Sequence, residues 1–436
     1  MRRTSLVLLA LTLGGCADEP DPPPPTLVAA PDSARVDAPG VLYGRVHTTS
    51  AGVYEGRLRW GGTEEAFWGD FFNGVKDENP WAAYVSPDAL AGARRPPTLF
   101  GIEVPWGEGE VELRRPFMAR FGDLVRIEAR GGVGEAVAGG ALEPEVRVTL
   151  KSGTVLDLDR LSSSDFDDGL RVWDRQRGVT DLGARAICAV DFLPTPPLAG
   201  DLRRLHGTVH VGRRAFRGPL QWNRTGALAS DVLTGRTADG DPFRVRFGDL
   251  RSVTRHDAGA RLALTDGREL EWTGPGAGPD HRGLYVDDAR YGRVLVSWAA
   301  VDRVEFEAGG TGPAYADYPP GRALAGAVVT RDGRRLAGRL VVDLDESETT
   351  ETLDAHAQGV DYTLPLALVA RVEVPESARV RVTLRSGETL VLSRSGDLGA
   401  GNAGVLVFGA DAARPAYVPW ADVARLDVDG PAASEG

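Results

Sequence analysis

The amino-acid sequence predicts an all-β protein built from three tandem repeats, each made of two halves of roughly 50 residues. A thirteen-residue pattern recurs three times, at 146–158, 260–272 and 380–392. Apolar and polar residues alternate on both sides of a Ser-Gly or Asp-Gly pair, which is typical of two antiparallel strands joined by a tight turn. The chain also holds 55 glycines and 29 prolines, which favour many turns over long helices.

A second pattern marks the first half of each repeat, so that the repeats span 41–196, 204–309 and 322–430. Each half then ends in a phrase that predicts a strand, one tight helical turn and a short closing strand. The matching positions are Leu42, Gly44, Val46, Gly56, Leu58 and Trp60 in the first copy, Leu205, Gly207, Val209, Gly218, Leu220 and Trp222 in the second, and Leu324, Gly326, Val328, Gly338, Leu340 and Val342 in the third.

The order of elements in each half resembles a small five-stranded barrel of the Sm type. We therefore expect two Sm-like β-barrel halves in each repeat, because closing a sheet of short strands removes its exposed edges. The alternative is a six-bladed β-propeller with one half in each blade. The barrels are favoured because propeller blade signatures are absent from the sequence and a strand opens at a fixed glycine: Gly169, Gly283 and Gly404.

The amino terminus predicts export. Arg2 and Arg3 precede an apolar run, Leu6 to Leu13, which as a helix covers only about 12 Å and is too short to span a membrane. The next residues, Gly14-Gly15-Cys16, complete a segment that resembles the lipobox of bacterial lipoproteins. The resemblance implies that residues 1–16 form a lipoprotein signal and that Cys16 carries the lipid, palmitate included. The alternative is an ordinary signal peptide with a chance cysteine.

Residues 17–40 contain seven prolines and predict a stiff, solvated tether. Ala17 follows the cysteine where an aspartate would favour retention in the inner membrane, so we expect anchoring to the outer membrane of the cell envelope. Lipid on Cys16 would leave Cys188 as the only thiol, and no disulfide within the chain is then expected.

The composition limits the classes of function. The 436 residues carry a formal charge of −12, which does not suit the continuous basic face of a nucleic-acid-binding protein. The expected partners are the membrane, through the lipid, and envelope proteins or glycans. The mature region also resembles uncharacterised repeat proteins of bacterial envelopes, in its AFWGDFFN, RFGDL and SGTVLDL segments. That resemblance implies an architecture and no activity.

The first repeat contains an insertion at about 64–120. Trp60 and Phe121 lie 61 positions apart, whereas the corresponding Trp222 and Phe247 lie 25 apart. Long loops are often functional, and this one is rich in aromatic residues. We expect a binding surface there, with Phe67, Trp68, Phe71, Phe72, Trp81 and Trp106 as its candidate residues.

Metal and catalytic sites are weakly indicated. Asp165, Asp167 and Asp168 group three carboxylates that suit Ca²⁺, but their spacing lacks the D-x-D-x-D-G order, so a solvated turn is the preferred interpretation. The six histidines fall at different positions of the three repeats, and neither a G-x-S-x-G nor an H-E-x-x-H motif is present. We expect no cofactor and no catalytic residues.

Together these features predict a non-enzymatic, lipid-anchored binding or scaffolding protein outside the cytoplasm. An alternative is a carbohydrate-binding protein that uses exposed aromatic side chains on envelope glycans. A third hypothesis, a hydrolase acting on envelope polymers, requires acidic or histidine side chains from different repeats to meet in one pocket.

Overall fold

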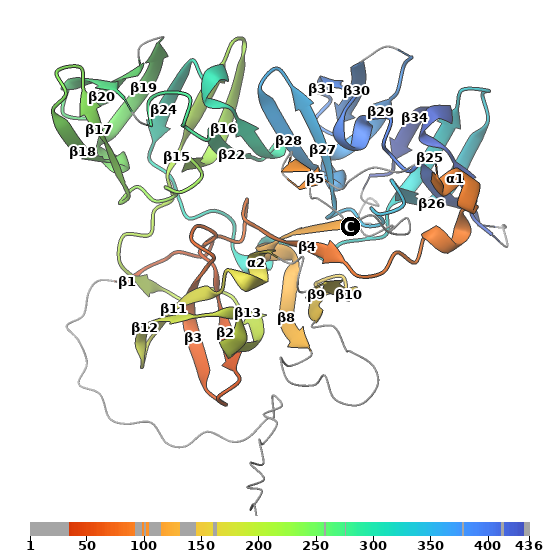
Figure 1. Ribbon diagram of the computed structural model, residues 1–436, viewed down its shortest axis with the longest axis horizontal. Helices are drawn as coiled ribbons and strands as arrows, with labels where there is room; N and C mark the ends of the chain where they lie inside the picture. Colours follow the sequence, from red (N-terminus) through yellow and green to blue (C-terminus); the bar gives the residue numbers. More distant parts are fainter. Residues whose placement is uncertain are drawn as a thin grey trace, which may run out of the picture.

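The computed structural model is all-β, as predicted (Figure 1). Three large antiparallel sheets contain most of the chain, and the only α-helices among the described residues are α1 (Pro87–Ala91) and α2 (Ser164–Asp167). Neither helix is long and apolar enough to cross a membrane, a finding that covers the described residues alone. The structure describes residues 35–91, 98–99, 102–103, 115–130, 145–159, 164–256, 259–274, 276–376, 379–410 and 414–430. Cys16 and the predicted signal lie outside these ranges.

Sheet 1, at the bottom of Figure 1, has ten strands in the order β12-β11-β3-β2-β13-β8-β9-β10-β4-β7. Its strands are β2 (Tyr43–Thr48), β3 (Val53–Trp60), β4 (Phe71–Lys76), β7 (Arg115–Arg120), β8 (Leu124–Arg130), β9 (Glu145–Leu150), β10 (Val155–Asp159), β11 (Leu170–Asp174), β12 (Gly178–Leu182) and β13 (Ile187–Phe192).

Sheet 2, at the upper left, has twelve strands in the order β18-β17-β21-β20-β19-β24-β15-β16-β22-β23-β28-β27. Its strands are β15 (His206–Val211), β16 (Arg214–Trp222), β17 (Val232–Thr237), β18 (Pro242–Arg246), β19 (Leu250–His256), β20 (Gly259–Leu264), β21 (Glu269–Thr273), β22 (Leu284–Asp288), β23 (Gly292–Val296), β24 (Arg303–Glu307), β27 (Thr352–Ala357) and β28 (Val360–Pro365).

Sheet 3, at the upper right, has eight strands in the order β31-β30-β29-β34-β25-β26-β32-β33. Its strands are β25 (Ala325–Thr330), β26 (Arg335–Val342), β29 (Val369–Glu373), β30 (Arg379–Leu384), β31 (Thr389–Ser393), β32 (Val405–Phe408), β33 (Ala416–Val418) and β34 (Val423–Val428). Two small pairs complete the strands: β1 (Arg35–Val36) with β14 (Leu198–Ala199), and β5 (Thr98–Leu99) with β6 (Ile102–Glu103).

Single turns of 3₁₀ helix link several strands. In sheet 1, η2 (Phe121–Asp123) joins β7 to β8 and η3 (Ala184–Ala186) joins β12 to β13, which confirms the predicted strand, tight turn and closing strand. The remaining turns are η1 (Ala82–Tyr84), η4 (Phe247–Asp249), η5 (Trp298–Ala300), η6 (Tyr315–Asp317), η7 (Leu366–Leu368), η8 (Gly396–Leu398) and η9 (Trp420–Asp422).

The three sheets arrange corresponding strands in the same order. The run β12-β11-β3-β2-β13-β8-β9-β10 of sheet 1 corresponds to β23-β22-β16-β15-β24-β19-β20-β21 of sheet 2 and to β33-β32-β26-β25-β34-β29-β30-β31 of sheet 3. The ten-strand order of sheet 1 also reads as a palindrome of the two halves, with the β13–β8 pair at its centre, and the ten strands from β18 to β23 of sheet 2 do so around the β19–β24 pair.

The two halves of sheet 1 exchange strands and do not form separate barrels. The hairpin β2–β3 of the first half pairs with β11 of the second half, and β10 of the second half pairs with β4 of the first. None of the three sheets closes on itself, so the predicted Sm-like barrels are not seen among the described residues, and neither are six separate blades. A half of five short strands instead covers its open edges with strands of the other half.

Facing glycines allow the first hairpin of each repeat to pack closely. Gly44 pairs with Gly56 across β2 and β3, and the same pairing recurs in the other two sheets. A Cβ atom on Gly56 would lie 2.1 Å from the carbonyl oxygen of Trp173 in β11. The glycines in the repeated pattern are therefore required by the contact between the exchanged strands.

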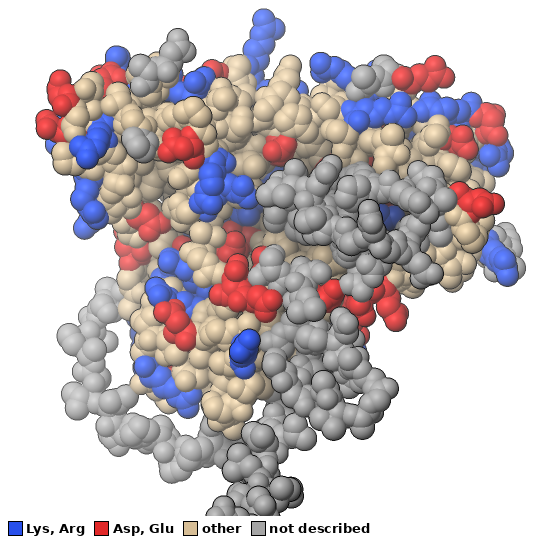
Figure 2. Space-filling model, viewed as in Figure 1, with Lys and Arg blue, Asp and Glu red and all other residues tan. Residues whose placement is uncertain are grey.

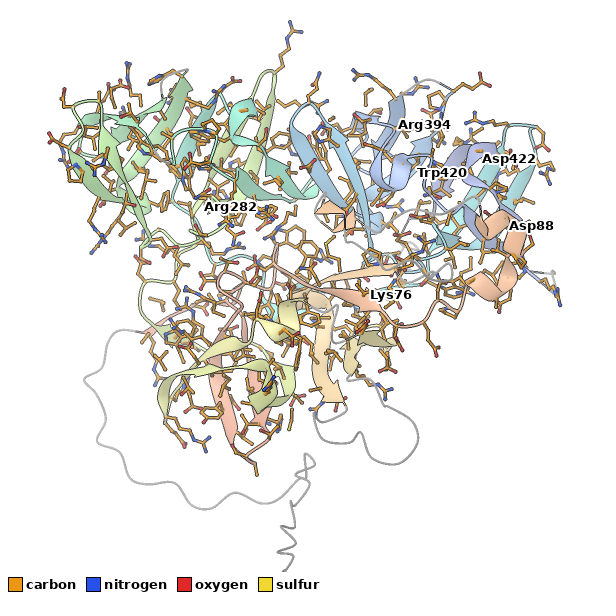
Figure 3. The ribbon with its side chains drawn as sticks, in the orientation of Figure 1. Lys76, Asp88, Arg282, Arg394, Trp420 and Asp422 are labelled. Atoms are coloured by element: carbon orange, nitrogen blue, oxygen red, sulfur yellow. The ribbon has the colours of Figure 1, made fainter. Side chains whose placement is uncertain are left out.

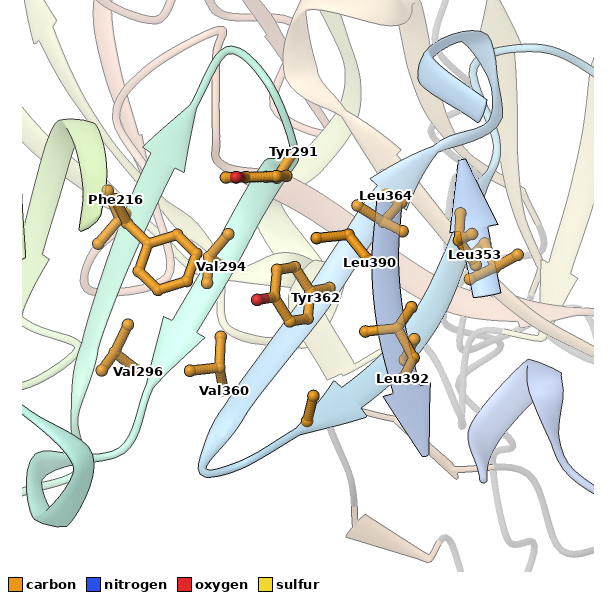
Figure 4. Packing of buried hydrophobic residues seen from close by; sticks show 14 of the residues in the cluster. Phe216, Tyr291, Val294, Val296, Leu353, Val360, Tyr362, Leu364, Leu390 and Leu392 are labelled. Atoms are coloured by element: carbon orange, nitrogen blue, oxygen red, sulfur yellow. The ribbon is translucent and has the colours of Figure 1, made fainter. Parts of the chain in front are cut away.

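Sheets 2 and 3 share one continuous hydrophobic core, whereas sheet 1 has a core of its own. The hairpin β27–β28 comes from the third repeat but adds to the edge of sheet 2, where β28 pairs with β23. Figure 4 shows Tyr362 of this hairpin between Phe216 and Val294 on one side and Leu390 and Leu392 on the other. The hairpin therefore joins the two cores into one.

Ion pairs cross neighbouring strands on the outward faces of the sheets. Arg147 pairs with Asp157 at 2.7 Å in sheet 1, and Arg261 pairs with Glu271 at 2.7 Å in sheet 2. Figure 2 shows basic and acidic side chains interspersed over the visible surface of all three sheets. Such partly exposed pairs stabilise a sheet by about 1 kcal/mol or less each.

The described end of the predicted tether belongs to the folded body. In the segment 35–40, strand β1 pairs with β14, and Ala38 is fully buried. Gly40 donates its backbone N–H to the hydroxyl of Thr311 at 3.4 Å. Assigning these six residues to a solvated tether was therefore wrong, because they complete a contact between the first repeat and the linkers that follow the first and second repeats.

Candidate functional site

Three of the predicted surface aromatics are buried: Phe67 and Phe72 in the core of sheet 1, and Phe71 against Arg293 of sheet 2. Phe67 and Phe72 are fully buried and Phe71 is 3 % exposed. Phe72 makes an edge contact with Trp60, with ring centroids 5.2 Å apart. All six residues of β4 are buried, so neither face of this strand meets solvent. The prediction that these three phenylalanines form a binding surface was wrong.

The inserted residues begin later than predicted. β4 and β7 pair with each other as β17 and β18 do, so these two strands of sheet 1 have counterparts in sheet 2. The extra residues are 77–114, which stand where 238–241 form a short turn in sheet 2. Sequence comparison placed the start near 64 because the phenylalanines of this segment have no counterpart in the other repeats.

Trp81 lies in the described part of the insertion and packs against sheet 3. Its ring contacts that of Phe408, with centroids 5.9 Å apart, and the guanidinium of Arg339 lies 5.1 Å from its centre. Val85 and Leu344 bury the same contact. Trp81 therefore serves an interface within the chain. The sixth candidate, Trp106, lies outside the described residues.

Trp68 is the remaining candidate, and it lines a cavity of about 760 Å³ that we call the central cavity. The cavity lies where the first repeat meets the other two, and its size is that of a typical ligand site. Most of its lining is apolar. The residues that matter here are Trp68, Arg120, His206, Pro219, Asp287 and Tyr318, together with Pro365 at the end of β28.

Trp68 and Tyr318 form an aromatic pair in the wall of the central cavity. Their ring centroids lie 6.4 Å apart at 41°, and the guanidinium of Arg120 lies 5.0 Å from the Trp68 ring and 5.5 Å from the Tyr318 ring. Arg120 is itself neutralised by Asp123, with 2.7 Å between Nε and Oδ2. The wall therefore offers ring faces whose neighbouring charge is balanced.

A buried network of ion pairs fixes the Trp68 loop against sheet 2. Arg204 donates to the backbone carbonyl of Trp68 at 2.9 Å and to Oδ2 of Asp287 at 3.1 Å. Arg293 donates to Oδ1 of Asp287 at 3.1 Å and to Oδ1 of Asp70 at 2.8 Å. Burial raises the pKa of Asp287 above its ordinary value, although the two guanidinium groups act in the opposite direction.

Tyr318 supplies an unused polar atom. The residue is 5 % exposed, and its hydroxyl has no hydrogen-bond partner among the described residues. Burial raises the pKa of Tyr318 well above its ordinary value, so the hydroxyl stays protonated and can both donate and accept. Burial also lowers the pKa of His206, which is neutral near pH 7.

The acidic loop at 165–168 shows no metal centre in the described part of the chain. Oδ2 of Asp165 accepts two hydrogen bonds from Asn73, each 2.7 Å long. Burial, followed by the charge of Asp167, raises the pKa of Asp168. No group of three or more metal-ligating side chains is found within those residues.

The protein is an all-β protein of three antiparallel sheets with a ligand-sized cavity that has an aromatic wall. No family model matches the chain, and comparison with curated proteins and with solved structures gives no match either. Trp68 was found from the sequence because it is an aromatic residue without a repeat counterpart. Tyr318 lies in the linker between two repeats and carried no such signal.

Proposed function

We propose that this protein is a non-enzymatic binding protein of the bacterial envelope, exported and held at the outer membrane by lipid on Cys16. The signal-like amino terminus and the Leu13-Gly14-Gly15-Cys16 segment support export and lipidation. Binding is supported by one structural observation: a cavity of about 760 Å³ whose wall combines the Trp68–Tyr318 pair with an unpartnered hydroxyl.

A glycan of the envelope is the second candidate for what the protein binds. Aromatic ring faces pack against the C–H face of a sugar ring, and a hydroxyl of the ligand can bond to a tyrosine hydroxyl. Three of the four charged residues that line the cavity, Arg120, Arg217 and Asp287, have ion-pair partners in the protein, which suits a ligand of little charge. A protein partner in a scaffold stays the first candidate from the sequence.

We also propose that the three sheets derive from one repeated unit, and that each unit derives from two related five-stranded halves. The shared strand order, the palindromes in sheets 1 and 2 and the facing glycines support this origin. The exchange of hairpins between halves gives each unit a single fold, so the halves would not be stable alone.

The experiment that tests binding compares full-length protein with Trp68→Ala and Tyr318→Phe on immobilised envelope glycans. We expect Trp68→Ala to reduce retention at least tenfold and Tyr318→Phe to reduce it several-fold, because the first removes a ring face and the second only a hydroxyl. Trp81→Ala is the matched control, since it removes an insertion tryptophan outside the cavity. Equal retention by all four proteins would exclude the glycan hypothesis for this cavity.

A scaffolding role needs a different variant. Deleting 64–120 would remove β4, β7 and core side chains, so it would unfold sheet 1. Replacing 77–114 with the four residues 238–241 keeps both strands and removes only the insertion. If envelope proteins co-purify with the parent chain and are lost with this variant, the insertion is their contact region; if they stay bound, it is not.

A further inference from the structure

The same carboxylate-capped turn occurs once in each of the three repeats. An acidic side chain accepts hydrogen bonds from two consecutive backbone N–H groups, and the backbone carbonyl of the same residue accepts from the first residue of the following 3₁₀ turn. The carboxylates and their donors are Asp70 with Glu65 and Ala66, Asp231 with Ala227 and Leu228, and Glu351 with Ser347 and Glu348. The three carboxylates are therefore structurally equivalent.

In two of the turns the second carboxylate oxygen binds a buried cation from another sheet. Oδ1 of Asp70 accepts from Arg293 of sheet 2 at 2.8 Å, and Oε1 of Glu351 accepts from Lys76 of sheet 1 at 2.8 Å. Arg293 and Lys76 are 7 % and 9 % exposed. This position thus receives a guanidinium in the first repeat and an ammonium group in the third.

The third turn receives no such cation from the described part of the protein. Both hydrogen bonds to Asp231 end on Oδ2, and Oδ1 has no partner among the described residues. Instead Asp231 lines a cavity of about 540 Å³ between sheet 2 and the 60–65 turn of sheet 1. We call it the Asp231 cavity. The carboxylate that binds one of the protein's own cations in the other two turns thus borders a cavity in this one.

Two carboxylates and one guanidinium line the Asp231 cavity. They belong to Glu65, Asp231 and Arg59. Glu65 is paired with Arg59 at 2.8 Å and also with Arg57, which lies outside the lining, at 2.6 Å. His281 also lines the cavity, but burial lowers its pKa to about 4, so it is neutral at pH 7. Asp231 is therefore the one lining charge without an opposite charge beside it.

Aromatic rings and two buried donors complete the lining. The rings of Trp222 and His281 lie 5.2 Å apart, and those of Trp222 and Trp272 lie 6.2 Å apart. Nδ1 of His281 accepts the backbone N–H of Gly283 at 3.0 Å, so the neutral ring carries its hydrogen on Nε2. Neither that Nε2 nor Nε1 of Trp272 has a hydrogen-bond partner in the described structure, although these two residues are 6 % and 1 % exposed.

We propose that the Asp231 cavity is a second binding site, for an organic cation with a guanidinium or primary ammonium group that pairs with Asp231. The aromatic rings stabilise the cation, and Nε2–H of His281 donates to an oxygen atom that the ligand carries beside the charged group. The site needs neither Trp68 nor Tyr318, so it is independent of the function proposed for the central cavity.

The experiment titrates full-length protein with N-acetyl-L-arginine methylamide and with its citrulline analogue, measured by calorimetry. The two probes have nearly the same shape, but only the first carries a positive charge. We expect saturable binding of the arginine probe and at least tenfold weaker binding of the citrulline probe. Since both titrations use the unaltered protein, the comparison does not depend on the folding of a variant.

Variants then locate the site. Asp231→Asn keeps an oxygen for the two backbone donors and should weaken binding of the arginine probe at least tenfold. His281→Phe keeps an aromatic ring and should weaken binding of that probe several-fold. Asp266→Asn, which changes an exposed carboxylate paired with Arg268, is the matched control and should bind as the parent does. Equal affinity for the two probes, no saturable binding at about 10 mM, or full affinity in a folded Asp231→Asn variant would each overturn the proposal and leave a water-filled cavity.

Discussion

Lys76 at the end of β4, labelled in Figure 3, binds Glu351 of the third repeat, with 2.8 Å between Nζ and Oε1. The same Nζ also lies 2.5 Å from Oδ1 of Asp345. Burial alone would lower the pKa of Lys76, but the two carboxylates outweigh it and hold that pKa above its ordinary value. Sheets 1 and 3 are thus joined by an ion pair that is shielded from water.

Removing the cation of this pair should destabilise the protein strongly. In Lys76→Met the carboxylates of Asp345 and Glu351 stay buried without a positive charge, which costs about 3–5 kcal/mol. Urea denaturation of the variant measures the loss. Arg171→Met removes a solvent-exposed pair with Asp181 and should leave the free energy of unfolding nearly unchanged. Similar losses in the two variants would show that the Lys76 pair is not the stronger contact.

Gly69 should not tolerate a side chain. Its φ is +89°, and a Cβ atom would lie 1.8 Å from Oδ2 of Asp287, which pairs with Arg204. Gly69→Ala should therefore break the buried network behind Trp68 in addition to straining the backbone. Gly240→Ala is a matched control because its φ is +88° and nothing lies within 4 Å of the added atom. Thermal unfolding should show that Gly69→Ala lowers the free energy of unfolding by at least about 2 kcal/mol more than Gly240→Ala does.

Glu64 should make the stability depend on pH. Burial, followed by the charges of Asp70 and Asp165, raises the pKa of Glu64 to about 7. The folded protein therefore holds a proton that the unfolded chain releases above about pH 4.5, and stability falls as pH rises from there to about 7. Glu64→Gln removes that loss of stability. The free energy of unfolding of the variant should therefore exceed that of the parent by up to about 3 kcal/mol at pH 8 and by little at pH 4.5. The same gain at both pH values would contradict the assignment.

The anchor is tested at Cys16. Cys16→Ser should move the protein from the membrane pellet into the soluble fraction, since the proposed lipid has no other attachment point. Mass spectrometry of the parent should then find the acyl chains on a fragment that begins at Cys16. A variant that still pellets with membranes would refute lipid anchoring.

The second cysteine, Cys188, provides an independent test of lipid attachment at Cys16. Cys188 in β13 is 6 % exposed, and Cys16 is the only other cysteine in the chain. A thioether lipid and a disulfide both require the sulfur of Cys16, so they exclude each other within one chain. Thiol labelling of the denatured, unreduced protein distinguishes them: one reactive thiol is expected if Cys16 is lipidated, and none if the cysteines are joined.

The hairpins were predictable because their signal is local. The pattern at 146–158 folds as β9 and β10 with its turn at Ser152-Gly153, and the two later patterns fold as β20–β21 and β30–β31. Alternation and a turn dipeptide suffice to fix such a pair. The tight turns before the closing strands were predictable for the same reason.

The exchange of hairpins was not predictable, because alternation shows which strands have an apolar face but not which strands pair. β3 could join β4, its neighbour in sequence, yet it pairs with β11, more than a hundred residues later. Phe71 and Phe72 point to opposite faces of β4, and both are buried because other parts of the chain cover each face. An aromatic-rich segment in a single sequence could equally have been exposed.

The Asp231 cavity was also outside the reach of the sequence. Asp70, Asp231 and Glu351 occupy one position of the repeat, but only the three-dimensional arrangement shows that two of them have a cationic partner and one does not. Lys76 and Glu351 are 275 positions apart, and no local pattern connects them.

Because the β27–β28 hairpin leaves its own repeat to extend sheet 2, the second and third repeats cannot be separated without damage to both. If the chain were cut in the linker near residue 321, the amino-terminal fragment would lack β27 and β28, which cover the edge of sheet 2. In the carboxy-terminal fragment, Tyr362 and Leu364 of the same hairpin would be exposed to water. Proteolysis there should yield insoluble pieces, and a gene that gained or lost a single repeat would encode an incomplete body.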